Sequence, residues 1–292
     1  MTPQEYCRNK AAQSGSNFYY SFLSLSDAKR EAITALYAVC REVDDIVDSH
    51  GDVHIKQIKL DWWRQEISRL FAGTPQHPIT RALLEPVQTF TLAAEHFQEI
   101  LDGMEMDLQT VRYPDFKDLN LYCHRVAGVV GILSAEIFGF EDRQTLKYAH
   151  NLGIAFQLTN IIRDVFDDMR HDRLYLPQAD LMKYGVTESQ IQQGQSSAAF
   201  EQLLRFQIER ANEYYARAMA QLPDVDRYNQ RAGLIMAAIY QRLLAEIKRD
   251  VSQVLARRVR LMPLQKLWIA WRTDRREQRH HRQFLRQTAH AG

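Results

Sequence analysis

The spacing of apolar residues constrains this sequence more than any other feature. Only 12 Gly and 8 Pro occur among its 292 residues. In the long stretches between them, apolar residues recur at intervals of three and four residues. This is the helical period rather than the period of two that a strand requires. We therefore expect about ten helices and an all-α fold. The clearest are predicted at Ser26–His50, Ile55–Phe71, Pro114–Phe138, Asp142–Asp168, Ala198–Gln221 and Asp226–Arg257.

The breaks between these stretches predict one domain rather than several. Turn residues end one helix at Gly73–Pro78, and Thr187–Gln190 has the pattern of a capping box after a break at Gly185. No linker-like segment divides the chain, and no repeat of about 20–50 residues occurs. With 46% apolar residues, the chain can bury a substantial core.

Charge and cysteine content restrict the partners and the compartment. Lys and Arg number 37 against 36 Asp and Glu, so no global field marks a nucleic-acid-binding protein. Cys7, Cys40 and Cys123 suit neither a disulfide framework nor a CxxC motif, which favours a reducing cytoplasm. The N-terminus lacks a signal-peptide core, and no stretch approaches roughly 18 consecutive apolar residues. We expect a cytoplasmic protein, soluble or at most peripheral at the inner face of the membrane.

Residues 266–292 differ from the rest in composition. They combine Trp268 and Trp271 with a series of arginines from Arg272 to Arg286. Such a segment either docks as an amphipathic helix on an anionic bilayer, or forms a solvated basic tail or an edge helix packed on the body. The sequence favours neither alternative, and it gives no indication of the oligomeric state.

A first polar stripe lies in the predicted helix Ser26–His50. At about 100° per residue, Tyr37, Arg41, Asp44 and Asp48 fall within roughly 60° of one another. An aromatic ring, a cation and two carboxylates therefore share one helix face.

A second polar stripe lies in the predicted helix Asp142–Asp168. By the same arithmetic, Gln157, Asn160, Asp164 and Asp168 occupy an arc of roughly 80°, and apolar residues take the other sides. Like charges at this spacing destabilise a helix by about 0.2–0.5 kcal/mol in water, and by more when they are partly buried. A bound cation would offset that repulsion.

The side chains of both stripes suit Mg²⁺. Carboxylates and an amide, with no His or Cys beside them, are ligands for a hard ion, and Mg²⁺ commonly takes one or two carboxylates plus phosphate oxygens and water. A single DxxxD pair is more often a solvated face, but two such stripes with Arg41 and Arg163 nearby favour a metal–diphosphate site. Arg163 lies about 120° from its stripe, so Arg41 is the better placed to bind diphosphate.

The two acidic motifs, Asp44–Asp48 and Asp164–Asp168, resemble the DxxxD motifs of the squalene/phytoene synthase family. Tyr122–Gly131 (YCHRVAGVVG) resembles the tyrosine-bearing segment of that family, and Asp172–Pro177 (DRLYLP) resembles its RxYxP flap. Shorter matches occur at Ser14–Phe22, Gly103–Asp107, Tyr240 and Arg257–Val259. The resemblance implies one class I isoprenoid synthase domain over residues 1–265, with both motifs facing each other across a central cavity.

The resemblance also implies roles for individual side chains. Two or three Mg²⁺ ions would be held by Asp44, Asp48, Asn160, Asp164 and Asp168. Substrate would be contacted by Ser16, Asn17, Phe18, Arg41, Gln157, Arg163, Arg173, Tyr240, and Arg257 or Arg258. The family often has a serine at the position of Asn17, so that contact differs here.

A dry aromatic pocket would protect the carbocation of such a reaction from water. The pocket would be lined by Phe18, Tyr37, Tyr122, Phe156 and Tyr240. Tyr37, Tyr122 and Tyr175 are the catalytic candidates. Tyr122 or Tyr37, or the released pyrophosphate, would accept a proton, and Tyr175 would close a flap over the site.

Within the family, Tyr6–Ser21 and Ile33–Tyr37 most resemble bacterial presqualene diphosphate synthases. The expected reaction is Mg²⁺-dependent head-to-head condensation of two farnesyl diphosphates to presqualene diphosphate and pyrophosphate, in squalene or hopanoid-type isoprenoid biosynthesis. The alternatives are a squalene, dehydrosqualene or phytoene synthase, or a non-catalytic assembly factor or lipid-binding homologue. No dinucleotide fingerprint occurs and no NADPH requirement is expected, although similar eukaryotic squalene synthases use NADPH without one.

Overall fold

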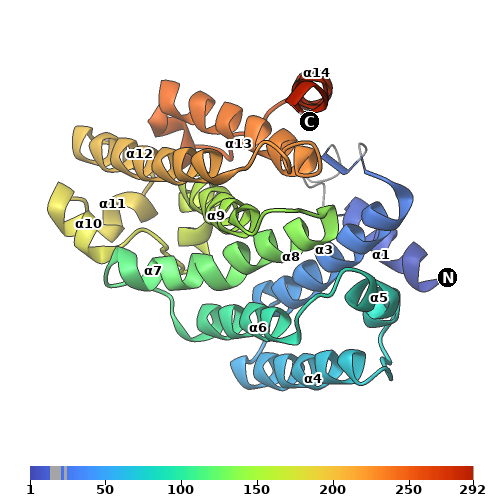
Figure 1. Cartoon of the computed structure of the whole chain (residues 1–292). Helices are drawn as coiled ribbons and strands as arrows, with labels where there is room; N and C mark the ends of the chain where they lie inside the picture. Colours follow the sequence, from blue (N-terminus) through green and yellow to red (C-terminus); the bar gives the residue numbers. More distant parts are fainter. Residues whose placement is uncertain (14–20, 23–24, 292) are drawn as a thin grey trace.

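The computed structural model describes residues 1–13, 21–22 and 25–291, and these form helices joined by loops. Over these ranges no strand occurs, and the only β-type pairing is an isolated bridge between Arg112 and Leu174. The expected all-α fold is confirmed. The helices (Figure 1) are α1 (Pro3–Gln13), α3 (Asp27–Asp48), α4 (Val53–Phe71), α5 (Pro78–Thr89), α6 (Ala94–Gln109), α7 (Phe116–Cys123), η1 (His124–Gly128), α8 (Val129–Phe138), α9 (Gln144–Arg170), α10 (Gln178–Tyr184), α11 (Glu188–Gln192), α12 (Ala198–Gln221), α13 (Arg231–Arg249), η2 (Val251–Leu255) and α14 (Pro263–Ala291).

Helix α9 runs through the middle of the molecule, with α12, α13 and α8 packed along it (Figure 1). The apolar residues of α9, α12 and α13 form one buried core. A second core lies between α3, α4, α5 and α6. Because α3 and α9 bury their apolar faces in different cores, each keeps a polar face for a site that the two helices share.

At two glycines, the backbone of α9 lies close to the backbone of α8 and of the turn that precedes α8. A Cβ added at Gly131 would lie 2.2 Å from the carbonyl oxygen of Ala149, and one added at Gly153 would lie 2.2 Å from that of Ala127. No side chain fits at either position unless a helix moves. The two glycines therefore fix the distance between these helices.

The predicted helix Pro114–Phe138 is interrupted by the π-helical turn η1. The turn brings Nδ1 of His124 to 2.9 Å from Nε2 of His150 on α9. A Cβ added at Gly128 would lie 2.9 Å from the His150 ring, so this glycine also makes room for a close contact. The helical period alone does not show such a turn, because a π turn adds one residue without changing the composition.

The stretch Phe116–Phe138 is, within the described ranges, the one with the length and mean hydropathy of a membrane-crossing helix. In the structure, 44% of its apolar window is buried inside the protein, and α8 packs against α9. The core helix of a globular protein has the same composition, so this stretch carries no membrane assignment.

The prediction of one helix over Asp226–Arg257 is wrong at both ends. Helix α13 begins at Arg231 and ends at Arg249. The Asp250 side chain then accepts a hydrogen bond from the backbone N–H of Ser252 and starts the 3₁₀ turn η2. A short polar side chain that binds the nearby backbone competes with helix continuation.

Asp226 supports the turn before α9 instead of beginning a helix. It is fully buried. Its carboxylate accepts hydrogen bonds from the backbone N–H groups of Glu141 (2.6 Å) and Asp142 (3.0 Å) and from the Thr145 hydroxyl (2.6 Å). It thereby holds the first turn of α9 in place.

Replacing Asp226 by Asn is expected to lower the free energy of unfolding by about 2–4 kcal/mol, because an amide nitrogen would face backbone donors in a buried site. Asp224→Asn is the matched control. The Asp224 side chain is 64% exposed, and this change should stay within about 0.5 kcal/mol. Urea unfolding followed by circular dichroism measures both, and equal losses would contradict the role given to Asp226.

The predicted turn chemistry between α10 and α11 is confirmed. Gly185 ends α10 in the left-handed conformation (φ 67°). Thr187 and Gln190 then form both hydrogen bonds of a capping box at the start of α11.

Candidate active site

In the first polar stripe, on α3, three residues are half-buried and Asp48 is exposed, while the neighbouring Val43 and Val47 are fully buried. Arg41 donates to Asp44 at 2.8 Å. Burial and the nearby charge of Asp48 raise the pKa of Asp44 to about 7. A carboxylate perturbed in this way gains stability from an added cation.

The second stripe occupies the half-buried face of α9. Asn160 donates from its side-chain nitrogen to Gln157 at 3.4 Å, but its buried Oδ1 has no partner among the described residues. Burial and the charge of Asp164 raise the pKa of Asp168 to about 8. Unlike Asp164, Asp168 forms no ion pair in the described part of the chain. This stripe therefore has oxygen ligands to offer.

Two arginines bind Asp164. Arg163 contacts both carboxylate oxygens, one of them at 2.7 Å, because its long side chain bends back toward the stripe. Arg258, which follows η2, reaches the same carboxylate at 2.8 and 2.9 Å. Arg257 instead donates to Gln253 at 3.0 Å. Of the two adjacent candidates, Arg258 lies in the site and Arg257 does not.

Arg173 lies between the two stripes: its backbone N–H donates to the carbonyl oxygen of Asp168 on α9 at 3.0 Å, and its side chain reaches α3. Beyond α9, Asp172 adopts the left-handed conformation (φ 57°) and turns the chain back toward α3. Nη1 of Arg173 then lies 2.8 Å from Asp48 and 3.4 Å from Asp107 on α6, and Nη2 donates to the carbonyl oxygen of Val47 at 3.2 Å. A cation suits this position, because the end of a helix has unpaired carbonyl groups.

The segment that carries Arg173 is fastened to the loop before α7. The backbone N–H of Leu174 donates to the carbonyl oxygen of Val111 at 3.1 Å. The Arg112 side chain donates to Asp172 at 2.9 Å. The predicted flap therefore lies against the body of the protein.

Asp107 is a site residue to which the sequence analysis gave no role, although the Gly103–Asp107 match included it. It is 6% exposed and accepts a hydrogen bond from Tyr175 at 2.5 Å. The Tyr175 ring stacks on Tyr122 and on Tyr113, another residue that the sequence did not single out. Burial and the charge of Asp107 raise the pKa of Tyr122 far above its usual value, so it is held as a neutral phenol.

An aromatic wall adjoins the arginines. The ring of Tyr240 on α13 lies 4.8 Å from that of Phe156 on α9, and Tyr240 also interacts with Arg163. Tyr37 lies beside Arg41 on α3. Aromatic side chains from three helices thus lie next to the charged groups, and the cation-protecting pocket itself stays a prediction.

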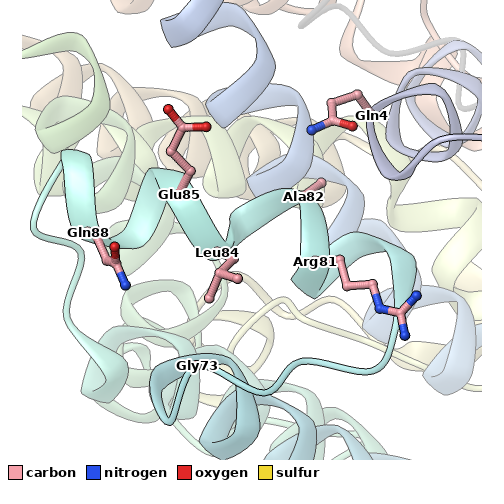
Figure 2. Close-up of a pocket in the computed structure, with 7 residues that line it drawn as sticks. All are labelled: Gln4, Gly73, Arg81, Ala82, Leu84, Glu85 and Gln88. Atoms are coloured by element: carbon pink, nitrogen blue, oxygen red, sulfur yellow. The ribbon is translucent and has the colours of Figure 1, made fainter.

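Three predicted site residues, Ser16, Asn17 and Phe18, lie outside the described residues. Elsewhere, a cavity of about 410 Å³ lies over α5 and the turn before it (Figure 2). It is lined by Gln4, Gly73, Arg81, Ala82, Leu84, Glu85 and Gln88. None of the predicted site residues is among them, so this cavity is separate from the two stripes.

The oxygen ligands of the two stripes fit a hard cation whose remaining ligands are water and phosphate oxygens. Among the described residues, no three His, Cys, Asp or Glu side chains converge closely enough to hold an ion alone. The unpartnered oxygen of Asn160 and the raised pKa values of Asp44 and Asp168 favour an added cation. Mg²⁺ held by one or two carboxylates per ion and by phosphate oxygens matches this arrangement.

Comparison with known proteins identifies the family of this chain. The squalene/phytoene synthase family profile matches residues 11–265. A phytoene synthase of Arthrospira platensis is 36% identical over 271 residues, which are 87% of this chain and 86% of the relative. A 15-cis-phytoene synthase of Synechococcus elongatus is 34% identical over 278 residues, 90% of this chain and 89% of that protein.

Solved structures give the same result. A dehydrosqualene synthase in complex with a ligand is similar with a TM-score of 0.81 and 25% identity, over 93% of this chain and 95% of that one. The squalene synthase HpnC from Alicyclobacillus acidocaldarius is similar with a TM-score of 0.75 and 27% identity, over 85% and 94%. The chain therefore belongs to the squalene/phytoene synthase family and is a prenyltransferase of the kind that condenses isoprenyl diphosphates.

Proposed function

We propose that this enzyme condenses two farnesyl diphosphates head to head, with Mg²⁺, to presqualene diphosphate and pyrophosphate. The observation that carries the reaction is the pair of acidic stripes on α3 and α9, with Arg173 bonded to both helices, to Asp48 through its side chain and to Asp168 through its backbone N–H. The farnesyl substrate is supported by the resemblance of Ile33–Tyr37 to presqualene diphosphate synthases, and by the squalene and dehydrosqualene synthases among the similar structures.

The first step breaks the allylic C–O bond of one substrate. The carboxylates of both stripes and Asn160 would hold Mg²⁺. When bound, the ion would supply neutralisation of the charge on the leaving diphosphate. Arg41, Arg163, Arg173 and Arg258 bind diphosphate oxygens, a role that suits the planar guanidinium group. All four already lie beside the stripe carboxylates.

The second step forms the cyclopropane. The aromatic wall of Phe156 and Tyr240 excludes water from the allylic cation, and the double bond of the second substrate attacks that cation. Loss of one proton closes the ring, and the second diphosphate stays on the product. A phenol hydroxyl is a poor proton acceptor, which applies to both tyrosine candidates, so the released pyrophosphate takes the proton.

The product assay tests this proposal. The enzyme is incubated with Mg²⁺ and farnesyl diphosphate, with and without NADPH, and the products are resolved by mass. We expect a cyclopropyl diphosphate that persists with NADPH, and one pyrophosphate for every two substrates. Squalene formed only with NADPH would overturn the proposed end point. Release of no pyrophosphate from farnesyl or geranylgeranyl diphosphate would indicate a non-catalytic homologue.

A second candidate is phytoene synthesis from two geranylgeranyl diphosphates. It is favoured by the curated relatives above, which are named as phytoene synthases. The same assay with geranylgeranyl diphosphate separates the candidates, because phytoene is a hydrocarbon whereas presqualene diphosphate keeps one diphosphate group. Faster turnover of the longer substrate to a hydrocarbon would replace the first proposal by this one.

Two adjacent arginines provide a matched test of diphosphate binding. Arg258→Ala is expected to lower kcat/KM by about 10–100-fold, because it removes a charged hydrogen-bond donor from the Asp164 side of the site. Arg257→Ala should change kcat/KM by less than about twofold, since this side chain contacts Gln253. Steady-state kinetics on both variants checks the assignment, and equal losses would refute it.

A further inference from the structure

The outer face of helix α14 is apolar at the start of the helix. Leu264 is 77% exposed, Leu267 43%, Trp268 55% and Trp271 59%. At about 100° per residue these four side chains fall within roughly 100° of one another, so they form one continuous surface. Large apolar side chains gathered on the surface mark an interaction site more often than scattered ones do.

The same face continues with cationic side chains. Arg275, Arg279, Arg282 and Arg286 lie in the same sector of the helix by the same arithmetic. Within the described part of the chain, none of the four forms an ion pair, and Arg275 lies over the Trp271 ring, 5.8 Å from its centroid. The outer face therefore carries unneutralised positive charge directly beside its apolar part.

The acidic residues of α14 are paired with the body of the protein. Glu277 is 1% exposed and accepts from Arg227 at 2.7 Å, and Asp274 lies 3.6 Å from Arg231. Both arginines belong to the body of the protein. Both acidic side chains are thus neutralised by arginines of the body, while the arginines of the outer face are not, a separation that a merely solvated helix does not require.

The position of α14 suits a surface that meets a large partner. Figure 1 shows the helix at the edge of the molecule beside α13. The helix begins at Pro263, five residues after Arg258, which binds Asp164 in the active site. A partner on this face therefore lies close in the chain to the site that handles isoprenoid chains.

We propose that the outer face of α14 docks the enzyme on a membrane surface rich in anionic phospholipid. The Trp and Leu side chains enter the boundary between headgroups and acyl chains, and the arginines bind lipid phosphates. A nucleic acid or an acidic protein would match the arginines but leave the exposed leucines in water. Because the whole chain carries a net charge of only +1, the attraction depends on this local face. The inference does not depend on the proposed product.

Vesicle sedimentation tests the surface with the full chain. Vesicles of phosphatidylcholine with about one third phosphatidylglycerol should bind the protein, pure phosphatidylcholine should bind it weakly, and salt should weaken the binding. Trp268→Ala with Trp271→Ala, and separately Arg279→Glu with Arg282→Glu, should each lower binding to the mixed vesicles by at least about tenfold.

The controls are exposed residues on other helices. Trp62→Ala on α4 removes a tryptophan that is 40% exposed. Arg205→Glu with Arg217→Glu on α12 makes the same charge change at side chains that are 47% and 57% exposed. Both controls should keep binding within about twofold. Circular dichroism and turnover in detergent-free buffer check that every variant is folded.

Three results would overturn the proposal. The first is no binding to the mixed vesicles, and the second is binding that the α14 variants leave unchanged. The third is a parent protein that does not bind vesicles and is a dimer by light scattering, together with α14 variants that are monomers. That result would assign the face to a second copy of the chain.

Discussion

Replacing Asp44 by Asn should lower prenyl transfer by about 10³-fold or more without unfolding the protein. The amide keeps the shape of the side chain but removes a negative charge of the proposed Mg²⁺ site. Because burial and Asp48 raise the pKa of Asp44 to about 7, the charged form destabilises the fold, and its removal should leave Tm unchanged or higher. Pyrophosphate release and thermal unfolding without Mg²⁺ measure the two effects.

Asp164→Asn should show the same loss of turnover with the opposite effect on stability. Its carboxylate binds Arg163 and Arg258, so the amide leaves both cations less well paired and Tm should fall. The matched control is Asp167→Asn, because Asp167 lies about 100° from Asp168 on the same helix. Turnover of this control should stay within about threefold of the parent enzyme. Full activity in Asp44→Asn would refute the metal assignment, and an inactive control would show that the loss is not specific to the stripes.

Arg173→Ala should lower the free energy of unfolding by about 3–5 kcal/mol and nearly abolish turnover. Arg173 pairs with Asp48 and with Asp107, which is 6% exposed. Its loss leaves a buried carboxylate without a cation, and burial already raises the pKa of Asp107. The neighbouring Arg170→Ala is the control, since Arg170 is exposed. Urea unfolding and pyrophosphate release give both values.

A second substitution separates the structural role of Arg173 from its catalytic role. In the Arg173→Ala background, Asp107→Asn removes the uncompensated charge and should restore at least about half of the lost stability. Turnover should stay low, because the cation that joins the stripes is still missing. Recovery of turnover together with stability would mean that Arg173 acts only through the fold.

The polar stripes were predictable because they follow from helix geometry alone. Tyr37 and Asp48, eleven residues apart, share a face in any regular helix, and so do Gln157 and Asp168. The structure places both sets on half-buried faces, apart from the exposed Asp48, with apolar residues packed behind them. Local periodicity therefore found most of the charged site.

Contacts between distant segments were not predictable in this way. Asp107 and Arg173 meet only because Asp172 turns the chain back beneath α3. The choice between Arg257 and Arg258 depends on the direction of the chain after η2, which no sequence period specifies. Asp226 was mistaken for a helix start because its tertiary partners are more than 80 residues away in the chain.

The backbone contacts at Gly131 and Gly153 limit how an enzyme of this kind can change its product during evolution. A side chain added at either glycine would push α9 away from α8 or from the turn before it, and α9 carries half of the charged site, so substitution at these two positions would disturb that site. A route that leaves both glycines in place is exchange of large and small side chains around the bound isoprenoid chain. Chain-length specificity can then diverge through a few substitutions, while the charged end of the site keeps its geometry.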